Sequence, residues 1–349
     1  MKKKVVFFLP PSVGGAERVS ITISKFLESE KYEVVYVILG EKIGDIRCFL
    51  PANKEIIHIK IINIWDFTIT KIVLFLRKIR PEYTFSSNRY INVRVLIASR
   101  IVGGIKNIVR NDNGLKTVRW DNRILMRLSY PWAYKIIAQQ EEMREELICV
   151  MNFAPQKVLT LHNPIDVQTI EKKTNAVNPF GNCKKIRYVW VGRFSKTKGQ
   201  DILLKAFAIV NKQNPNTELY YIGKYENNDF YYNIVDFVNS NNLKDSVHFV
   251  GFDDNPYRWV KYCDCFVMPS RYEGLPNSLI EAMYIGKPVV ATRCVPIVDR
   301  IVKDGYNGYL VNSEDYRTLA EKMQKALELK NFNMTYIPSS IDDFRVLFQ

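Results

Sequence analysis

The chain has 349 residues, of which 47% are hydrophobic and 25% charged, and its formal net charge is +14 at pH 7. This length suits two domains that each bury a core, and the composition excludes a largely disordered or fibrous protein. The basic balance indicates an anionic partner, because nucleic acids, acidic membrane surfaces and phosphorylated substrates all attract positive charge.

Residues 1–161 alternate short β-branched runs with longer amphipathic runs. Strands are predicted at 4–9, 33–39, 55–61, 83–87, 107–111, 135–139 and 157–161. Helical patterns lie between most of them, for example at 17–28 and 89–102. Apolar strands separated by helices predict a parallel sheet covered by helices on both faces.

The alternation stops at 162–185, a polar stretch with two Asn-Pro steps, where we predict an interdomain linker at 166–185. It resumes with strands predicted at 187–192, 218–223, 246–252, 265–270 and 288–292. The chain is therefore predicted to be an α/β protein with two tandem Rossmann-like, doubly wound domains, at 1–165 and 186–330. Ligands of such sheets lie beyond the carboxyl ends of the strands, so we expect the site in a cleft between the domains.

The six cysteines are scattered, and only Cys263 and Cys265 are close in sequence. A lone Cys-x-Cys without a second pair or a nearby His is a weak metal pattern, so we predict buried free thiols in a reducing cytoplasm. The apolar run Val5–Leu9 is shorter than the core of a signal peptide needs, and we interpret it as a buried strand.

Two glycines, Gly14 and Gly15, follow the first predicted strand and precede the first helix, in the stretch "PPSVGGAER". Paired glycines here would let a bound group approach the free N–H groups of the helix. A turn that needs a positive φ is the alternative.

Arg193 and Lys198 flank a polar loop after the strand predicted at 187–192, in the stretch "VGRFSKTKG". A planar guanidinium and a flexible ammonium at the carboxyl end of a strand suit a diphosphate, because one binds two oxygens at once and the other acts as a point charge. Alternatively, both are solvated loop charges.

The stretch "RYEGLPNSLIEAM" contains Glu273 and Glu281 with seven residues between them. Pro276 fits the first position of a helix that we predict to end at Ile285, with Gly286 as its stop signal.

Gly274 and the backbone N–H groups around Asn277 and Ser278 would form an anion site at the start of this helix. Carboxylates on both sides of a phosphate would repel it, so Glu273 and Glu281 make better sense as acceptors of hydrogen bonds from hydroxyl groups beside the phosphate. A nucleoside-diphosphate sugar has this layout, with a ribose diol, two phosphates and sugar hydroxyls.

These motifs resemble those of the retaining GT-B glycosyltransferases of glycosyltransferase family 4, in particular bacterial enzymes that build surface polysaccharides such as O-antigen or capsule. The Glu-x7-Glu stretch is the most specific part. The stretches "VGRFSKTKG", "GFDDNPYRWVKYCDCFVMPS", "DGYNGYLV" and "GGAERV" support it, and the resemblance covers nearly the whole chain.

The resemblance implies roles for individual residues. Glu281 would bind the ribose hydroxyls, and Glu273 would contact the hydroxyls of the donor sugar. Glu273, Arg193 and Lys198 form the implied catalytic group, in which the two cations clamp the diphosphate. The other implied substrate-binding positions are Gly274, Leu275, Pro276, Asn277, Ser278, Gly14, Gly15, Glu17, Gly223, Asn255, Arg110 and Asn111. Arg110 and Asn111 stand where many relatives carry a His near the reacting sugar.

The predicted function is transfer of a sugar, with retention of anomeric configuration, from a nucleoside-diphosphate sugar to a glycan or polyprenyl-diphosphate-linked acceptor. A UDP-sugar is the expected donor, acting as co-substrate, and no cofactor is expected. The sequence contains no Asp-x-Asp, so we predict metal-independent transfer. The alternatives are a GT-B sugar-nucleotide epimerase and a non-catalytic protein that binds nucleotide sugars.

The first 180 residues contain 28 Lys and Arg against 17 Asp and Glu. The basic, aromatic stretch 115–135, with Lys116, Arg119, Trp120 and Trp132, could lie on an anionic membrane, whereas an ordinary amphipathic helix is the alternative. No nucleic-acid recognition motif accompanies these charges. We expect a cytoplasmic protein, with peripheral contact to the inner face of the membrane as an option. A return of the tail at 331–349 to the first domain is one option that the resemblance implies. The tail is short where relatives continue helically back to that domain, so domain closure that is supported differently is the alternative.

Overall fold

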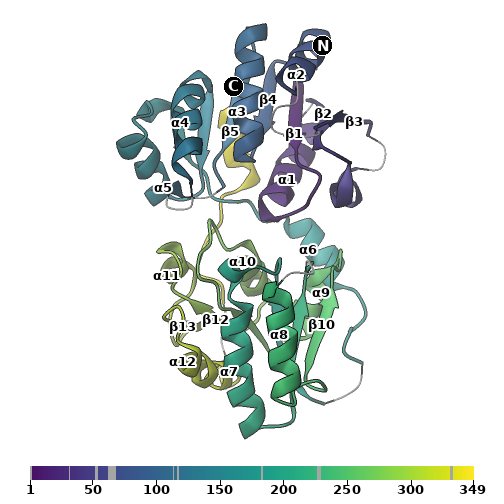
Figure 1. Ribbon diagram of the computed structural model, residues 1–349, viewed down its shortest axis with the longest axis vertical. Helices are drawn as coiled ribbons and strands as arrows, with labels where there is room; N and C mark the ends of the chain where they lie inside the picture. The colour runs from purple at the N-terminus through teal and green to yellow at the C-terminus, as the bar shows by residue number, and fades with distance from the viewer. Residues whose placement is uncertain are drawn as a thin grey trace. The chain divides into compact units, whose positions relative to one another are not determined.

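The structure is a computed structural model that describes residues 2–30, 32–51, 54–61, 68–112, 114–115, 118–181, 184–225, 229–330 and 333–349. It divides into two compact units. The first contains Met1–Ile165 and Pro338–Gln349, and the second contains Asp166–Ile337. Each unit has its own parallel sheet (Figure 1), which confirms the predicted fold class.

The sheet of the first unit has seven parallel strands in the order β3-β2-β1-β4-β5-β6-β7. The strands are β1 (Lys4–Leu9), β2 (Glu33–Gly40), β3 (Ile56–Lys60), β4 (Tyr83–Ser86), β5 (Lys106–Arg110), β6 (Lys135–Ala138) and β7 (Val158–Thr160). The helices are α1 (Gly15–Ser29), α2 (Thr68–Ile79), α3 (Arg89–Val102), α4 (Trp120–Ser129) and α5 (Glu141–Glu145), with the short turns η1 (Gly44–Phe49), η3 (Tyr130–Trp132), η4 (Glu146–Val150) and η5 (Pro155–Lys157).

Both faces of this sheet are buried, as the continuous apolar strands predict. Phe7 of β1 packs in a cluster with residues of α1, whereas its neighbours Val6 and Phe8 pack with residues of α2 and α3. Successive side chains of a strand point to opposite faces, so a fully apolar strand needs helices on both sides.

The last residues of the chain form the 3₁₀ helix η7 (Ile341–Phe348). Phe344, Leu347 and Phe348 are buried in the same cluster as Phe7. The hydroxyl of Tyr32 also donates to the carbonyl oxygen of Phe348 at 3.0 Å. The end of the chain is therefore part of the core of the first unit.

The sheet of the second unit has six strands in the order β10-β9-β8-β11-β12-β13. They are β8 (Ile186–Val191), β9 (Thr217–Ile222), β10 (Val247–Gly251), β11 (Cys265–Met268), β12 (Val289–Thr292) and β13 (Gly308–Val311). The helices are α6 (Val167–Thr174), α7 (Gln200–Gln213), α8 (Asp229–Ser240), α9 (Pro256–Tyr262), α10 (Asn277–Tyr284), α11 (Ile297–Ile301) and α12 (Tyr316–Ala326), with the short turn η6 (Lys196–Lys198).

Three local features differ from the sequence-based expectations. The segment predicted as a linker, 166–185, begins with helix α6 and belongs to the second unit. Strand β13 lies in the "DGYNGYLV" stretch, where no strand was predicted. Helix α10 begins at Asn277, and Pro276 is its N-cap instead of its first residue. Local pattern locates elements better than it locates their ends.

The two sheets share one topology, in which the second and third strands of each unit lie to one side of its first strand and the remainder lie to the other. The order reverses between β1 and β4 in the first unit and between β8 and β11 in the second. Loops that follow these strands diverge at the carboxyl edge, and ligands of doubly wound sheets bind there. None of the helices in the described ranges is long and apolar enough to cross a membrane.

Candidate functional site

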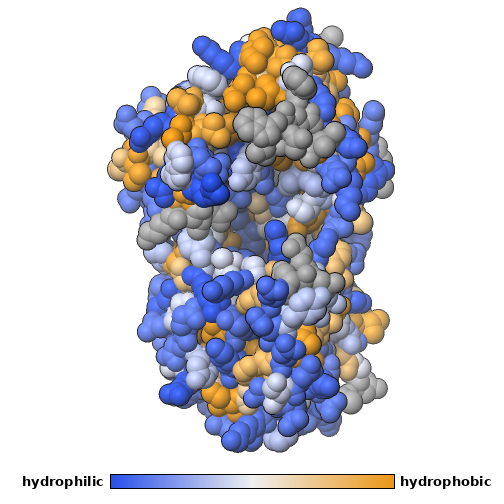
Figure 2. All heavy atoms as spheres, in the orientation of Figure 1, coloured by the Kyte–Doolittle hydropathy of each residue, from blue (hydrophilic) through white to orange (hydrophobic). Residues whose placement is uncertain are grey.

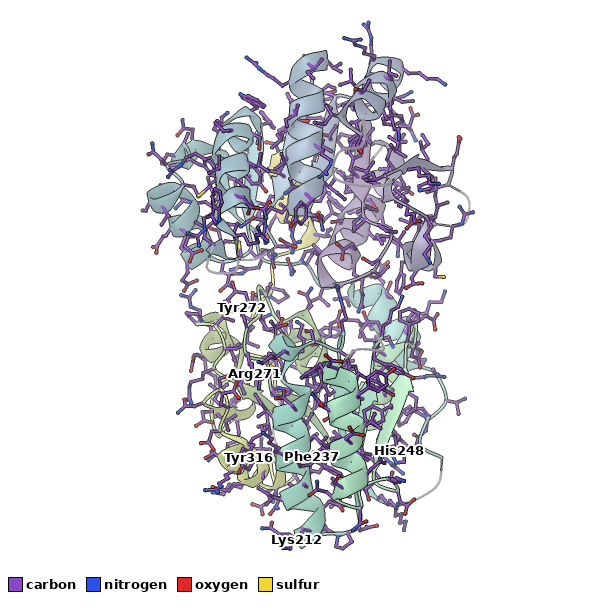
Figure 3. All side chains as sticks on the ribbon, viewed as in Figure 1. Lys212, Phe237, His248, Arg271, Tyr272 and Tyr316 are labelled. Carbon is purple, nitrogen blue, oxygen red and sulfur yellow. The ribbon has the colours of Figure 1, made fainter. Side chains whose placement is uncertain are left out.

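The loops after β8 and β11 meet at the switch point of the second unit. The backbone N–H of Arg271 donates to the carbonyl oxygen of Thr197 at 2.8 Å, so the two loops are directly joined. Figure 3 shows Arg271 and Tyr272 at one end of this unit and Lys212, near the end of α7, at the other.

Two glycines allow these loops to approach neighbouring backbone. Gly199 has a φ of +69°, and a Cβ at this position would lie 2.0 Å from the carbonyl oxygen of Pro269. Gly223, after β9, has a φ of +150°, and its Cβ would lie 1.6 Å from the carbonyl oxygen of Gly192. Both positions require glycine for conformation and for space. Gly223, predicted to bind substrate, thus has a clear structural role.

Lys198 and Glu273, two of the three predicted catalytic residues, form an ion pair. The ammonium of Lys198 lies 2.5 Å from Oε2 of Glu273, and the hydroxyl of Ser270 donates to Oε1 at 2.7 Å. Glu273 is buried, with 8% of its surface exposed. Both oxygens of this carboxylate are therefore held, which fixes its orientation.

Cys294 lies close enough to this pair for its titration to be affected. Burial, and then the charge of Glu273, raise the pKa of the Cys294 thiol to about 12, although the charge of Lys198 acts in the opposite direction. The thiol is therefore protonated at neutral pH and is a poor nucleophile. The five cysteines in the described residues are free thiols, as predicted, and Cys183 lies outside those residues. The prediction that they are buried is wrong for Cys48 and Cys149, which are exposed, and for Cys294, which is half-buried.

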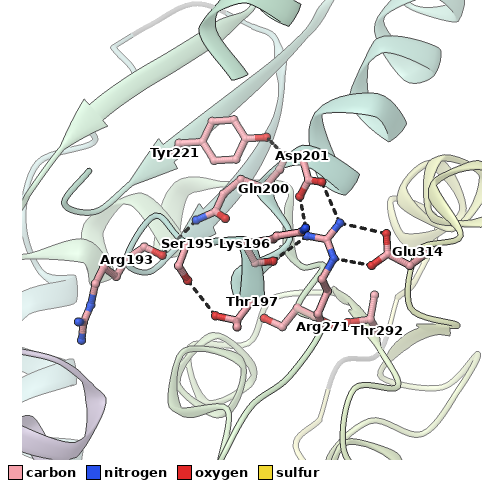
Figure 4. Close-up of polar contacts among 11 residues, drawn as sticks. Arg193, Ser195, Lys196, Thr197, Gln200, Asp201, Tyr221, Arg271, Thr292 and Glu314 are labelled. Carbon is pink, nitrogen blue, oxygen red and sulfur yellow. Dashed lines mark hydrogen bonds and ion pairs between the residues drawn. The ribbon is translucent and has the colours of Figure 1, made fainter. Parts of the chain in front are cut away.

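Arg271, two residues before Glu273 in sequence, contacts the same loops (Figure 4). Its guanidinium donates to both carboxylate oxygens of Asp201 at 2.8 Å, and it also pairs with Glu314. A further bond reaches the carbonyl oxygen of Lys196 at 2.6 Å. These contacts join the start of α7, the η6 turn and the loop before α12, so Arg271 fixes the loop that carries Glu273.

The same contacts change the acidity of the partners. Burial would raise the pKa of Asp201, but the hydrogen bonds and charge of Arg271 lower it below its ordinary value. The hydrogen bonds to Asp201 correspondingly raise the pKa of Arg271. Both groups are therefore charged throughout the physiological range.

Arg193, the third predicted catalytic residue, is not part of this network. Its carbonyl oxygen accepts a hydrogen bond from the side chain of Gln200 at 3.1 Å, which fixes the backbone. Its guanidinium points away from the Arg271 contacts (Figure 4) and is exposed. Within the described part of the chain it has no ion-pair partner, so its charge is available to a ligand.

The start of α10 differs from the predicted anion site. The N–H of Asn277 donates to the carbonyl oxygen of Leu275 at 2.9 Å, and those of Leu279 and Ile280 donate to Pro276. The prediction that the Asn277 N–H is available to an anion is therefore wrong, because a tight turn uses it. Ser278 is the first-turn residue whose N–H has no such bond among the described residues, and Leu275 and Pro276 are buried beside it.

Glu281 lies in the second turn of α10 and contacts a different element. The hydroxyl of Tyr257, in α9, donates to its Oε1 at 3.2 Å. Glu281 is half-buried. The two glutamates of the motif therefore contact different elements, Glu273 the η6 turn through Lys198 and Glu281 helix α9 through Tyr257.

Asn255, predicted to bind substrate, precedes α9. Its side-chain N–H donates to the carbonyl oxygen of Lys173 at 2.9 Å, which ties α9 to α6. Its Oδ1 is buried without a hydrogen-bond partner in the described residues. The adjacent Asp253 accepts bonds from Arg258 and from the indole of Trp259, each at 2.7 Å, so this loop is held firmly.

In the first unit, Gly14 and Gly15 lie at the start of α1. Gly14 is the N-cap with an extended φ of −132°, and its N–H donates to the carboxylate of Glu17 at 2.8 Å. Gly15 is helical. The alternative of a turn with positive φ is therefore wrong. Glu17 is 7% exposed and completes a capping box at the carboxyl edge of this sheet.

Arg110, the last residue of β5, is 1% exposed. One terminal nitrogen donates to Oδ1 of Asn163, but Nε and Nη1 are buried without hydrogen-bond partners in the described residues. Burial lowers its pKa to about 10, although the negative charges of Asp112 and Glu17 act in the opposite direction. A buried guanidinium with two unused donors is costly, and such groups call for a ligand or ordered water.

Asn111 and two amide side chains surround this arginine. Asn111 is 1% exposed, and its carbonyl oxygen accepts a bond from Gln139 at 3.0 Å. Asn163 in turn donates to Gln139 at 3.3 Å. The carboxyl ends of β5, β6 and β7 therefore carry a buried polar cluster that can donate to and accept from hydroxyl groups.

Several residues that hold the site were not predicted from sequence. They are Ser270, Arg271, Asp201, Glu314, Tyr257, Gln139 and Asn163. Ser270 and Arg271 stand three and two residues before Glu273, so their position gave a signal. Tyr257 belongs to the stretch "GFDDNPYRWVKYCDCFVMPS", which supported the resemblance. Asp201, Glu314, Gln139 and Asn163 lie far from the Glu-x7-Glu stretch in sequence and had no such signal.

Comparison with known proteins places these features in context. Residues 172–340 match the family described as glycosyl transferases group 1. An uncharacterized glycosyltransferase of Methanocaldococcus jannaschii is 26% identical over 255 residues, which are 66% of this chain and 61% of that protein. The N-acetylgalactosamine-N,N'-diacetylbacillosaminyl-diphospho-undecaprenol 4-alpha-N-acetylgalactosaminyltransferase of Campylobacter jejuni is 26% identical over 353 residues, covering 96% and 93% of the two chains.

Among solved structures, Anabaena HepE in complex with UDP-glucose superposes with a TM-score of 0.77. Its sequence identity is 20%, over 93% of this chain and 90% of that one. At this identity the likeness establishes the fold.

Proposed function

Because residues 172–340 match the family described as glycosyl transferases group 1, we propose that the chain moves a sugar from a nucleoside-diphosphate sugar to a glycan or lipid-linked glycan, with retention of configuration. The observation that carries the proposal is the Lys198–Glu273–Ser270 contact at the switch point, inside the family segment. The relatives named above are transferases by name, which favours transfer over the epimerase alternative.

The donor diphosphate would bind the two cations of the β8 loop. Arg193 is exposed with a free guanidinium, and Lys198 is half-buried with its ammonium fixed by Glu273. Departure of the nucleotide leaves negative charge on its terminal phosphate, and each fixed donor aimed at such a charge typically contributes about 3 kcal/mol. The N–H of Ser278 would add one donor from α10.

Glu273 acts as a positioning group in this mechanism. Its two oxygens already accept bonds from Ser270 and Lys198, which lowers their nucleophilicity towards the anomeric carbon. Each oxygen can still accept a hydrogen bond from a sugar hydroxyl, because a carboxylate oxygen accepts more than one bond. The alternative, a covalent glutamyl intermediate, would require one of these hydrogen-bonded oxygens to act as the nucleophile.

Glu281 would bind the ribose hydroxyls, with Tyr257 fixing the carboxylate from α9. A UDP-sugar is the proposed donor. HepE, whose fold is shared, was solved with UDP-glucose.

In the first unit, Arg110, Asn111 and Glu17 would bind hydroxyl groups of a substrate, and Gly14 and Gly15 would leave room for it. The unused nitrogens of Arg110 supply donors, and Glu17 and Asp112 supply acceptors nearby. Two carboxylates around one guanidinium disfavour a diphosphate and favour uncharged sugar hydroxyls.

A polyprenyl-diphosphate-linked glycan is the proposed acceptor. The Campylobacter relative, which aligns over nearly its whole length, carries diphospho-undecaprenol in the name of its acceptor. Metal-independent transfer is proposed because Arg193 and Lys198 supply the charge that a divalent cation would otherwise provide.

Thermal unfolding in the presence of UDP-, GDP- and ADP-glucose, with and without EDTA, tests the donor site. We expect the UDP-sugar to raise the melting temperature, with EDTA having no effect. Glu281→Ala should abolish the shift, and Arg193→Ala should lower the rate of UDP release more than it changes folding. Unfolding curves that are the same with and without each of the three nucleotide sugars would refute the donor site.

Transfer itself is tested with UDP-sugars and a synthetic undecaprenyl-diphosphate-linked sugar. NMR of the glycoside product should show the anomeric configuration of the donor. An inverted product would refute retention, and a free sugar formed without acceptor dependence would favour the epimerase alternative.

A further inference from the structure

The outward side of α4 and the segments beside it hold six large apolar side chains in solvent. They are Trp120, Ile124, Leu125, Leu128, Trp132 and Val150, with exposed fractions of 72, 51, 47, 63, 42 and 52%. Arg127 of α4 donates to the carbonyl oxygen of Val150 at 2.7 Å, so η4 lies against α4. Figure 2 shows hydrophobic side chains over this part of the first unit, and we name these six residues the α4 face.

Folding does not require this face to be apolar. Helix α4 is anchored by Met126 and Ser129, which are buried on its inner side. Trp120, Ile124 and Leu128 are spaced by four residues and so share the opposite, outward side. An apolar surface helix normally turns its apolar stripe to the core, so an outward stripe of this kind marks an interaction surface.

Cations surround the α4 face. Arg119 is 76% exposed in its side chain, with Asp121 at 3.2 Å. Arg123 and Arg127 donate to backbone carbonyl oxygens of Leu115 and Val150. Carbonyl groups orient these two guanidinium groups without neutralising them, so their charges remain available to external anions.

Lys157 adds a cation at the Trp132 end of the face, since its ammonium binds the carbonyl oxygen of Pro131 at 2.7 Å. The glutamates of the adjacent α5 and η4 are partly engaged elsewhere. Glu141 pairs with Arg144, and Glu146 accepts the N–H of Leu115. Glu142 lies in α5 as well and the exposed Glu145 ends it, so Arg119, Arg123, Arg127 and Lys157 form the basic part of a rim that also holds acidic groups.

We propose that the α4 face docks the protein on an anionic lipid bilayer. Trp120 and Trp132, at the two ends of the face, have the amphipathic rings that favour the headgroup level, and the leucine and isoleucine side chains between them would enter the acyl boundary. The arginines would meet lipid phosphates. A second copy of the chain fits less well, because a symmetric contact would bring the arginines of both copies together.

Co-sedimentation of the full chain with lipid vesicles tests the proposal. We expect binding to phosphatidylcholine vesicles that contain phosphatidylglycerol and weaker binding to pure phosphatidylcholine. Trp120→Ser with Leu128→Ser should lower the partition coefficient at least about tenfold. Raising the salt concentration should weaken the wild-type binding, because the phosphate contacts are screened.

Val177→Ser is the matched control, since Val177 is 85% exposed and lies in the second unit. A second variant, Arg119→Gln with Arg127→Gln, should lose binding to the anionic vesicles while keeping the apolar face. Equal binding by the wild type and the serine double variant, or no binding by the wild type, would overturn the proposal.

Size-exclusion chromatography with light scattering tests self-association. A dimer that the serine double variant loses, together with no vesicle binding, would overturn the proposal in favour of a second copy. Vesicle binding needs neither donor nor acceptor, so its failure and failure of the donor-dependent thermal shift are separate results.

Discussion

The two units share a strand order but hold charge at the carboxyl edge of their sheets differently. In the second unit Lys198 pairs with Glu273, and Arg271 pairs with Asp201 and Glu314. In the first unit Arg110 is buried with two nitrogens that lack partners among the described residues. The fold thus decides where the loops gather, and the side chains decide whether the buried charges at the edge are already paired or still need oxygen atoms from a ligand.

The largest expected effect is at Lys198. Lys198→Met should lower the rate of UDP release from a UDP-sugar by roughly 10²–10³-fold, because a fixed donor to the leaving group is lost. The matched control is Lys196→Met, two residues earlier, whose side chain is exposed. An equal loss in both variants would show that general loop charge, and not the pair with Glu273, is what matters.

Gly199→Ala should have the next largest effect, on folding. The new Cβ would lie 2.0 Å from the carbonyl oxygen of Pro269, in a residue with a φ of +69°. Gly181→Ala is the control, because Gly181 has a φ of +65° but nothing within 4 Å. We expect Gly199→Ala to lower the free energy of unfolding in urea by roughly 1–3 kcal/mol more than the control does. Equal losses would mean that the loops can move apart.

Arg110→Met tests the difference between the two units most directly. Removing a buried charge with unused donors should leave the free energy of unfolding unchanged or raise it, while the rate of transfer falls roughly tenfold to a hundredfold. Lys198→Met should instead lower stability by about 1–2 kcal/mol, because buried Glu273 keeps only Ser270. A strong destabilisation by Arg110→Met would assign Arg110 a structural role.

The smallest expected effect concerns pH. The folded pKa of Asp201 is lowered, so its contribution to stability is fully present above the unfolded value, about 4, and is lost as the pH falls through the folded value. Asp201→Asn should therefore lower the free energy of unfolding by about 1–2 kcal/mol at pH 7, with the difference from wild type shrinking in acid. Urea unfolding at both conditions measures it, and a difference that does not shrink would rule out the charge of Asp201 as its cause.

The sequence by itself determined the two parallel sheets, because hydrophobic periodicity is a local property that each strand and helix carries. It also located the loops after β8 and β11, since turn residues and short motifs follow the strands directly. It failed at element ends, as at Pro276, and for β13, whose short run ends a glycine-rich stretch.

Only the tertiary structure decided which charged side chains pair with one another. Lys198 and Glu273 are 75 residues apart, and Arg271 and Glu314 are 43 apart. No local pattern pairs such residues, because contact depends on how the strands order themselves in the sheet. The unpartnered nitrogens of Arg110 and the solvent exposure of the α4 face also follow from burial, which is a property of the packed chain and not of any segment.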